Sequence, residues 1–285
     1  MRRIRFSLAI LPMLALCACT VDVNTASVLG SDDEVKPLDI GALSGDGKER
    51  FGNMRIESLT MRHPDGVTTR GIHLIAPESR VVIVYLTGNK MRIRERGEML
   101  LPRFVQLGVD VLWMDYRGLG ASEGEASLDN LQADTAELID LAASLHKKIV
   151  VQGLSMGSVL AVRGAQAPWV SGLVLEGGIT SIPQVVDATM PEWAKLFLHV
   201  NIAPELSSID NLETLQKYDR PLLVMVGLDD NETPPVLSKR LYAVASSSHK
   251  CLLEVPKAEH RTTMNFDQAI QSYRHFLEYD ILAEP

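Results

Sequence analysis

Short apolar runs alternate with helical stretches along most of this chain, and this alternation constrains the fold more than any other feature. A continuous apolar run occupies Val81–Leu86, as in a strand that is buried on both faces of a sheet, and Val109–Asp115 is expected to be a second buried strand. Arg92–Leu107 and Leu128–Leu145 place their apolar residues at helical spacing. Strands separated by helices form right-handed crossovers, which lay the strands parallel. The sequence therefore predicts an α/β protein with a mostly parallel sheet flanked by helices.

A hairpin precedes this alternation, and one stretch interrupts it. Arg55–His63 and Val67–Ile75 are β-like on either side of a Pro-Asp-Gly turn, which predicts an antiparallel pair. Further strands are expected at 148–152, 173–176, 222–226 and 251–255, and further helices at 156–166, 235–245 and 262–282. The stretch 179–218 mixes prolines with large apolar residues. We expect it to form a small helical cap inserted into the domain.

The sequence Gly153-Leu154-Ser155-Met156-Gly157 is a G-x-S-x-G motif that follows an expected strand and opens an expected helix. This context is typical of a nucleophile elbow, in which a serine sits on a strained turn and glycines let neighbouring elements approach. The turn also places Ser155 at a helix N-terminus, where backbone N–H groups stabilise developing negative charge. Ser155 is therefore the candidate nucleophile.

A serine hydroxyl is a weak nucleophile without a base, and the chain has seven histidines. Functional side chains of such sheets follow the carboxyl ends of strands. Of the seven, His260 alone lies directly after the last expected strand and before the last helix. His260 is therefore the candidate base.

Two aspartates compete for the role of the acid that orients this base. Asp229 and Asp230 follow the strand at 222–226 and lie between Ser155 and His260 in the chain. The order serine, aspartate, histidine fits either of them. A calcium loop is disfavoured, because the acidic cluster 229–232 lacks the EF-hand spacing and its glycine.

The sequence resembles the serine aminopeptidase and abhydrolase-domain group of α/β-hydrolases over about residues 55–280. Gly227, Asp230 and Pro234 match the G-x-x-D-x-x-x-P motif of this group, and this resemblance favours Asp230 over Asp229. Residues 115–124 match D-Y-R-G-x-G-x-S-x-G, and residues 86–89 match L-H-G-N with Thr87 in place of the histidine. The resemblance implies the α/β-hydrolase fold.

The same resemblance implies an oxyanion hole and no cofactor. The expected donors are the backbone N–H groups of Met156 and Asn89. Neither a metal nor a cofactor is expected. The glycine-rich run 118–124 does not indicate dinucleotide binding, because its spacing is G-x-G-x-x-x-G and it follows the second parallel strand.

The N-terminus resembles a bacterial lipoprotein signal. Three arginines among the first five residues precede a short apolar stretch, 6–16, and Leu16-Cys17-Ala18-Cys19 is similar to a lipobox. The resemblance implies cleavage after residue 18 and acylation of Cys19. We therefore expect a signal peptide at 1–18, a flexible polar tether at 19–50 and the hydrolase domain at 51–285.

The net charge and the cysteine content limit the kinds of partner and chemistry that we expect. Without residues 1–18 the chain would carry 25 basic and 36 acidic residues, a net charge of −11. This negative net charge disfavours binding to nucleic acid or to anionic lipid. The protein would therefore be held to the membrane by the acyl chains on Cys19 and not by electrostatic attraction. Cys251 is expected to be a buried strand residue without a catalytic role.

Together these features predict a serine hydrolase that cleaves a carboxylic ester or thioester through an acyl-enzyme, acting on small-molecule or lipid substrates. We expect it to be lipid-anchored in the bacterial envelope, at the periplasmic face of the outer membrane if the cell is Gram-negative. Two alternatives remain open at this point: a serine aminopeptidase, and a non-catalytic envelope scaffold.

Overall fold

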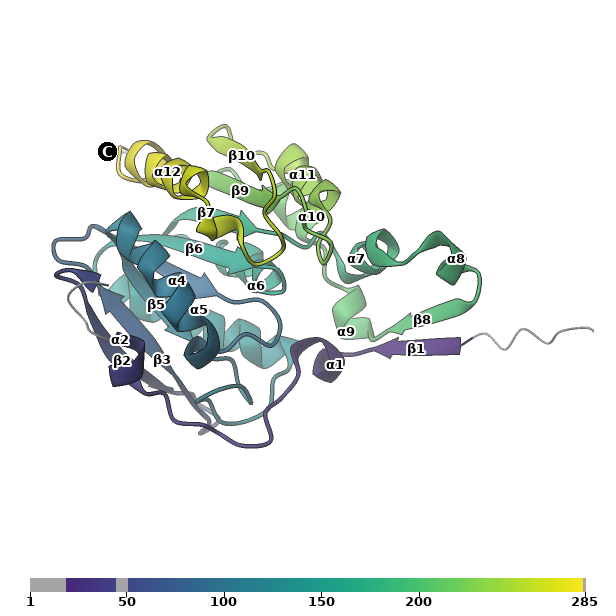
Figure 1. Ribbon diagram of the computed structural model, residues 1–285, viewed down its shortest axis with the longest axis horizontal. Helices are drawn as coiled ribbons and strands as arrows, with labels where there is room; N and C mark the ends of the chain where they lie inside the picture. Colours follow the sequence, from purple (N-terminus) through teal and green to yellow (C-terminus); the bar gives the residue numbers. More distant parts are fainter. Residues whose placement is uncertain (1–18, 45–50, 284–285) are drawn as a thin grey trace, which may run out of the picture.

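An eight-stranded sheet forms the centre of the computed structural model, which describes residues 19–44 and 51–283 (Figure 1). In their order across the sheet the strands are β10 (Lys250–Val255), β9 (Leu222–Gly227), β7 (Val170–Glu176), β6 (Lys148–Leu154), β4 (Val81–Leu86), β5 (Asp110–Met114), β3 (Thr68–Ile75) and β2 (Arg55–Arg62). The strands from β10 to β5 are parallel, whereas β3 and β2 form the antiparallel hairpin. The predicted mostly parallel α/β sheet is confirmed.

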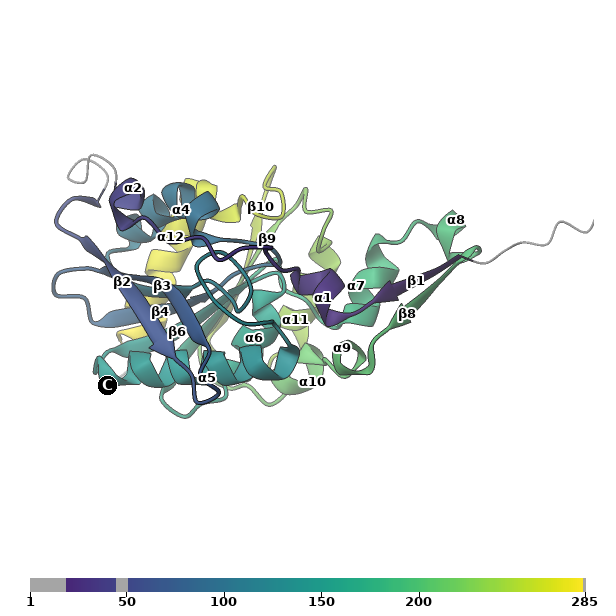
Figure 2. The ribbon, with the colours of Figure 1, turned by 90° about the horizontal axis from the view of Figure 1, so that it is seen from below.

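Helices cover both faces of this sheet. One core packs against α5 (Leu128–Ser144), α6 (Gly157–Gly164), α10 (Asn211–Leu215) and α11 (Pro235–Val244), and the other against α2 (Ile40–Ser44), α4 (Ile93–Leu107) and α12 (Asp267–His275). In β4 the alternate residues Val82 and Val84 belong to the first core, and Val81 and Ile83 to the second. Figure 2 shows α4 and α5 on opposite sides of the sheet. The continuous apolar run of β4 thus supplies both cores.

The stretch expected to form a helical cap contains helices and one strand. Its elements are α7 (Ile182–Thr189), α8 (Glu192–Lys195), β8 (Leu198–Ile202), α9 (Pro204–Ser207) and α10. The strand β8 pairs in parallel with β1 (Cys19–Val23), from the start of the described chain. In Figure 1 this two-stranded pair, together with α7, α8 and α9, forms an arm that projects from the body of the molecule. We call the strands β1 and β8 and the helices α7, α8 and α9 together the arm.

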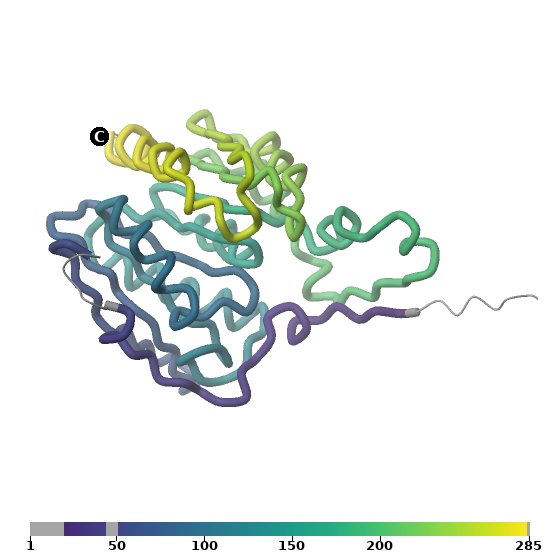
Figure 3. The backbone as a smooth tube through the Cα atoms, in the orientation of Figure 1, coloured from purple at the N-terminus to yellow at the C-terminus, as the bar shows by residue number. Residues whose placement is uncertain are grey.

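Residues 19–44 differ from the flexible tether expected over 19–50. After β1 the chain forms α1 (Thr25–Leu29), which buries Leu29, and then crosses the domain to α2 (Figure 3). On this path the Asp32 carboxylate accepts hydrogen bonds from Arg92 Nε at 2.7 Å and from the Gly120 N–H at 2.8 Å. A buried leucine and a bound carboxylate fix a segment whose composition is mostly polar.

The remainder of the N-terminal expectations falls outside the described residues. These are the signal peptide at 1–18 and the tether residues 45–50. Among the residues that the structure describes, no helix has both the length and the apolarity to cross a membrane.

Cys251 lies in β10, as expected, but its side chain is exposed rather than buried. The reason is the position of the strand. Because β10 is the edge strand of the sheet, it has a neighbouring strand on one side only. The apolar run 251–253 indicated a strand without indicating where in the sheet that strand lies.

Candidate active site

Ser155 occupies a strained turn between β6 and α6. Its φ angle is 52°, in the left-handed region that non-glycine residues rarely adopt. A Cβ on Gly153 would lie 2.5 Å from the Gly157 carbonyl oxygen, and a Cβ on Gly157 would lie 2.1 Å from that of Leu86. Both glycines are therefore required by close approach of the main chain. The geometry of a nucleophile elbow expected from the motif is present.

The end of β7 connects this turn to the rest of the site. The Ser155 N–H donates to the Glu176 carbonyl oxygen at 2.9 Å. The next residue, Gly177, has a φ angle of 52°, and a Cβ there would lie 3.1 Å from Asp230 Oδ2 and 3.3 Å from His260 Nδ1. Two consecutive residues thus contact the serine turn on one side and the aspartate–histidine pair on the other.

Asp230 and His260 form a buried hydrogen-bonded pair. His260 Nδ1 donates to Asp230 Oδ2 at 2.8 Å, and the two residues are 4% and 3% exposed. The second carboxylate oxygen, Oδ1, accepts from the backbone N–H groups of Glu232 at 2.9 Å and Thr233 at 2.8 Å. These donors stabilise an ionised carboxylate away from water and fix its orientation.

The neighbouring Asp229 takes no part in this pair. It is exposed, and its N–H donates to the Ala258 carbonyl oxygen. Of the two aspartates that the sequence left in competition, the structure therefore brings Asp230 to the histidine, as the family resemblance indicated.

Thr233 is a site residue that the sequence did not reveal. Its Oγ1 lies 2.8 Å from Asp230 Oδ2, 3.0 Å from the Gly177 carbonyl oxygen and 3.0 Å from His260 Nδ1. It is 2% exposed. The hydroxyl therefore joins the loop after β9 to the end of β7. The only sequence signal is its place just before Pro234 in the motif, and that signal says nothing of its contacts.

Ser155 and His260 lie on either side of the β7 end but are not hydrogen-bonded to each other. In the described part of the chain the Ser155 hydroxyl has no hydrogen-bond partner, and Ser155 is 9% exposed. His260 Nε2 lies 3.9 Å from Glu232 Oε2. In enzymes without substrate the hydrogen bond between a catalytic serine and its histidine is often long, and it shortens in the reacting complex.

Of the two residues expected to supply the oxyanion hole, Met156 adjoins Ser155 in the chain, and Asn89 follows Gly88, which approaches Ser155 in space. Met156 follows it directly at the N-terminus of α6. The loop after β4 approaches from the other side, since a Cβ on Gly88 would lie 3.3 Å from Ser155 Cβ. Within residues 19–44 and 51–283, neither the Met156 nor the Asn89 N–H donates a hydrogen bond. Both donors are therefore free to bind an anionic oxygen.

The motif at 115–124 has a structural function. The Asp115 carboxylate accepts from the N–H groups of Ile93 at 2.8 Å and Ala121 at 3.0 Å, and so holds the start of α4 to the glycine-rich loop. Burial raises the pKa of this carboxyl to about 6. Arg117 binds Asp134 with two hydrogen bonds of 2.7 Å. These contacts fix the loop, and they do not reach Ser155.

Glu176 is a second buried carboxyl group near the histidine. It is 2% exposed, and Gln152 Nε2 donates to its Oε2 at 3.3 Å, while the Tyr273 hydroxyl donates to Gln152 Oε1 at 3.1 Å. Burial raises its pKa to about 7, and the nearby His260 acts in the opposite direction. The sequence marked Glu176 only as the end of a strand.

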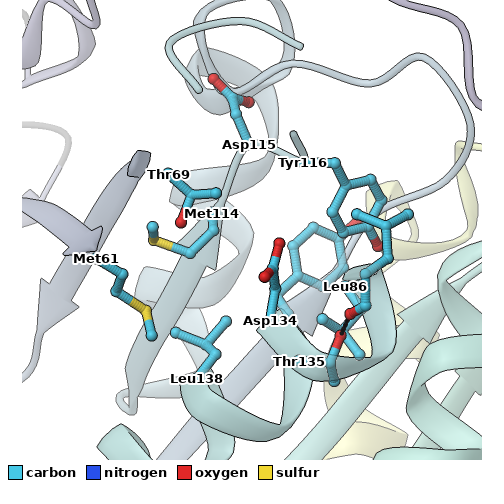
Figure 4. Close-up of a pocket in the computed structure, with 11 residues that line it drawn as sticks. Met61, Thr69, Leu86, Met114, Asp115, Tyr116, Asp134, Thr135 and Leu138 are labelled. Atoms are coloured by element: carbon cyan, nitrogen blue, oxygen red, sulfur yellow. Dashed lines mark hydrogen bonds between the residues drawn. The ribbon is translucent and has the colours of Figure 1, made fainter. Parts of the chain in front are cut away.

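A pocket lies apart from this arrangement, between the sheet and α5 (Figure 4). Its lining includes Met61, Leu86, Met114, Tyr116 and Leu138, and Figure 4 shows these side chains around it. Ser155, Asp230 and His260 do not line it.

In the residues covered by the structure, no group of three or more His, Cys, Asp or Glu side chains is arranged to hold a metal ion.

Comparison with known proteins adds a family and a fold. Residues 77–208 match the family model described as serine aminopeptidase, S33. The protein bem46 of Schizosaccharomyces pombe is 28% identical over 240 residues, which cover 80% of this chain and 79% of bem46. The α/β-hydrolase domain-containing protein WAV2 of Arabidopsis thaliana is 28% identical over 229 residues, 74% of each chain.

Among solved structures, the esterase Pf2001 of Pyrococcus furiosus has a similar fold. It superposes with a TM-score of 0.66 at 20% sequence identity and covers 89% of this chain and 98% of the esterase. At this identity the likeness establishes the fold alone. The expected α/β-hydrolase architecture is confirmed.

The raised pKa of Glu176 predicts a dependence of stability on pH. An ordinary glutamate has a pKa of 4.5, so between that pH and about 7 the unfolded chain has lost a proton that the folded chain retains. The free energy of unfolding should therefore fall as pH rises across this window, by about 3 kcal/mol at most. Glu176→Gln removes the titratable carboxyl group. We therefore expect the free energy of unfolding of this variant, measured in urea, to decline less than that of the wild type between pH 5 and pH 8.

The matched control is Glu213→Gln, on the exposed face of α10, which should decline as the wild type does. If Glu176→Gln and the wild type decline equally, Glu176 is ionised in the folded state throughout this range.

Proposed function

Because the chain belongs to the α/β-hydrolase superfamily, we propose that it is a serine hydrolase that cleaves a carboxylic ester or thioester through an acyl-enzyme. The observation that carries the proposal is the buried Asp230–His260 hydrogen bond of 2.8 Å, held against the same strand end that fixes the Ser155 turn. A histidine that is hydrogen-bonded to a carboxylate near a strained serine is the arrangement that activates a hydroxyl group.

In this mechanism Ser155 attacks the acyl carbon, and His260 accepts the hydroxyl proton at Nε2. Nδ1 is occupied by its hydrogen bond to Asp230, so Nε2 is the nitrogen that is available. Asp230 stabilises the imidazolium that forms, and His260 then returns the proton to the leaving oxygen or sulfur. The N–H groups of Met156 and Asn89 stabilise the oxyanion. Water then hydrolyses the acyl-enzyme by the same steps.

Several observations favour an ester or thioester over a peptide. A peptidase that binds a free amine would need an acidic group at the substrate site, and the arm carries three candidates. Asp187 and Glu192 are exposed and both pair with Lys195 at 2.8 Å. Glu205 accepts a hydrogen bond from Thr25 at 3.2 Å. Two of these carboxylates are thus bound within the arm, and the third is bound to the first residue of α1.

The nucleophile is tested by Ser155→Ala. We expect the variant to lose labelling by a fluorophosphonate probe and to lose at least about a thousandfold in hydrolysis of acyl esters, because the residues of a triad act as a unit. His260→Ala should lose a comparable factor. Labelling and ester turnover are measured on samples whose circular dichroism and melting match the wild type. A folded wild type that takes no label would indicate the non-catalytic scaffold.

The acid is tested by a matched pair of neighbouring variants. Asp230→Asn keeps the shape of the side chain but weakens the stabilisation of protonated His260, so we expect a loss of about a thousandfold or more in turnover. Asp229→Asn changes an exposed side chain that does not contact the histidine, and its turnover should stay near that of the wild type. Steady-state hydrolysis of a soluble ester ranks the two. The opposite ranking would assign the role to Asp229.

We further propose that the chain is a bacterial envelope lipoprotein, cleaved after residue 18 and acylated at Cys19. The support is the lipobox-like sequence at 16–19, whose last residue, Cys19, is the first residue of β1. The acyl chains would bring the domain to membrane-bound substrates and raise their effective concentration at the site.

Cys19→Ser tests this anchor. The hydroxyl cannot carry the thioether-linked lipid, so we expect the variant to lose metabolic labelling by a fatty-acid analogue and to leave the membrane fraction. Hydrolysis of short soluble esters should be unchanged, because the site lies on the sheet and not on β1. Label that persists in Cys19→Ser, or an unlabelled wild type, would contradict the assignment.

A further inference from the structure

The arm brings Cys19, the residue proposed to carry the lipid, to its outer end. In the parallel pair of β1 and β8, Cys19 is opposite Leu198 and Val23 is opposite Ile202. Figures 1 and 2 both show the first residues of β1 and β8 beside α8, at the end of the arm farthest from the sheet. Whatever is attached to the chain at Cys19 is therefore attached there.

This outer end exposes large apolar side chains. Trp193 is 69% exposed, Leu196 is 78% exposed and Phe197 is 42% exposed, within five consecutive residues. We call these three residues the arm tip. Elsewhere in the described chain the exposed large apolar side chains are separated along the sequence, as on most protein surfaces. A cluster of this kind marks a surface that binds something apolar, and tryptophan is favoured where one side of a contact is apolar and the other is wet.

The charges near the arm tip do not favour an electrostatic partner. Lys195 binds both Asp187 and Glu192 at 2.8 Å, so the one ammonium group is shared by two carboxylates. The local charge is therefore slightly negative, which opposes binding to an anionic surface. Binding through this surface would rest on apolar contact and would depend little on salt.

The residue at the start of β1 identifies the occupant. Cys19 lies at this same end of the arm and is the lipobox-like cysteine. The acyl chains proposed at Cys19 would hold this end of the molecule at a bilayer. We propose that the arm tip is a membrane-docking surface, which inserts Trp193, Leu196 and Phe197 into the lipid interface beside the attachment point at Cys19. This proposal goes beyond the hydrolase activity and can be tested without it, and its choice of a bilayer rests on the proposed acylation of Cys19.

The three tryptophans of the chain allow a direct measurement. Trp113 is fully buried, Trp169 is half-exposed before β7, and Trp193 is in the arm tip. The full chain, as processed by the cell, is reconstituted into phosphatidylcholine vesicles with or without brominated acyl chains, which quench tryptophan on contact. Trp169→Phe leaves Trp193 as the exposed reporter, and Trp193→Phe leaves Trp169 as the matched control.

We expect brominated lipid to reduce the emission of the Trp169→Phe protein by about a third or more, and this loss should persist in 1 M NaCl. The emission of the Trp193→Phe protein should be unchanged. Equal quenching in both variants, or none in Trp169→Phe, would overturn the proposal. So would a blue shift of Trp193 emission that follows protein concentration in the absence of lipid, since that result would assign the arm tip to a second copy of the chain.

Labelling of Ser155 by the fluorophosphonate probe is measured on the same samples. Labelled protein without quenching would exclude the docking surface and leave the hydrolase proposal standing. Quenching without labelling would do the reverse. A Leu196→Ser, Phe197→Ser variant, which changes exposed side chains only, should weaken the quenching of Trp193 while soluble-ester turnover stays at the wild-type level.

Discussion

Close approach of the main chain at the carboxyl ends of β4, β6 and β7 is the constraint on which the candidate site depends. The Leu86 carbonyl oxygen lies where a Cβ on Gly157 would be, and the Glu176 carbonyl oxygen binds the Ser155 N–H. Gly177 then lies directly against the aspartate–histidine pair. Because the contacts at Gly157 involve backbone atoms, a larger side chain there would displace the main chain after β4, and one at Gly177 would push against the side chains of Asp230 and His260. The positions of the three functional side chains follow from the sheet itself.

Burial gives the polar groups of the site their orientation. Asp230 is almost wholly removed from water, which would be costly for an unpaired carboxylate. Backbone N–H groups, the Thr233 hydroxyl and His260 together occupy its two oxygens. The same low polarity keeps a proton on Glu176 to a higher pH than usual, because burial raises the pKa of this carboxyl to about 7.

The parts of this structure that could be predicted from sequence are those that depend on local pattern. Buried strands such as β4 are continuous apolar runs. Ser155 lies in a five-residue motif that contains both of the glycines on which its turn depends. Asp230 needed the family resemblance, because Asp229 fits the same order. Thr233 acts through contacts with Gly177 and His260, which are distant in the sequence, so no local pattern reports it. The segment 19–44 was missed for a similar reason, since its partners are β8 and Arg92.

The pairing of β1 with β8 also determines how freely the domain could move about its attachment point. A disordered linker of about thirty residues has an end-to-end distance of roughly 30 Å and would let the domain rotate freely. Here the chain instead passes from Cys19 through a hydrogen-bonded strand, a short helix and the Asp32–Arg92 ion pair into the domain. A protein held at residue 19 would therefore have a fixed distance between its attachment point and the domain. The edge of the sheet that carries Ser155 would then reach a narrower range of heights above the surface than a disordered tether would allow.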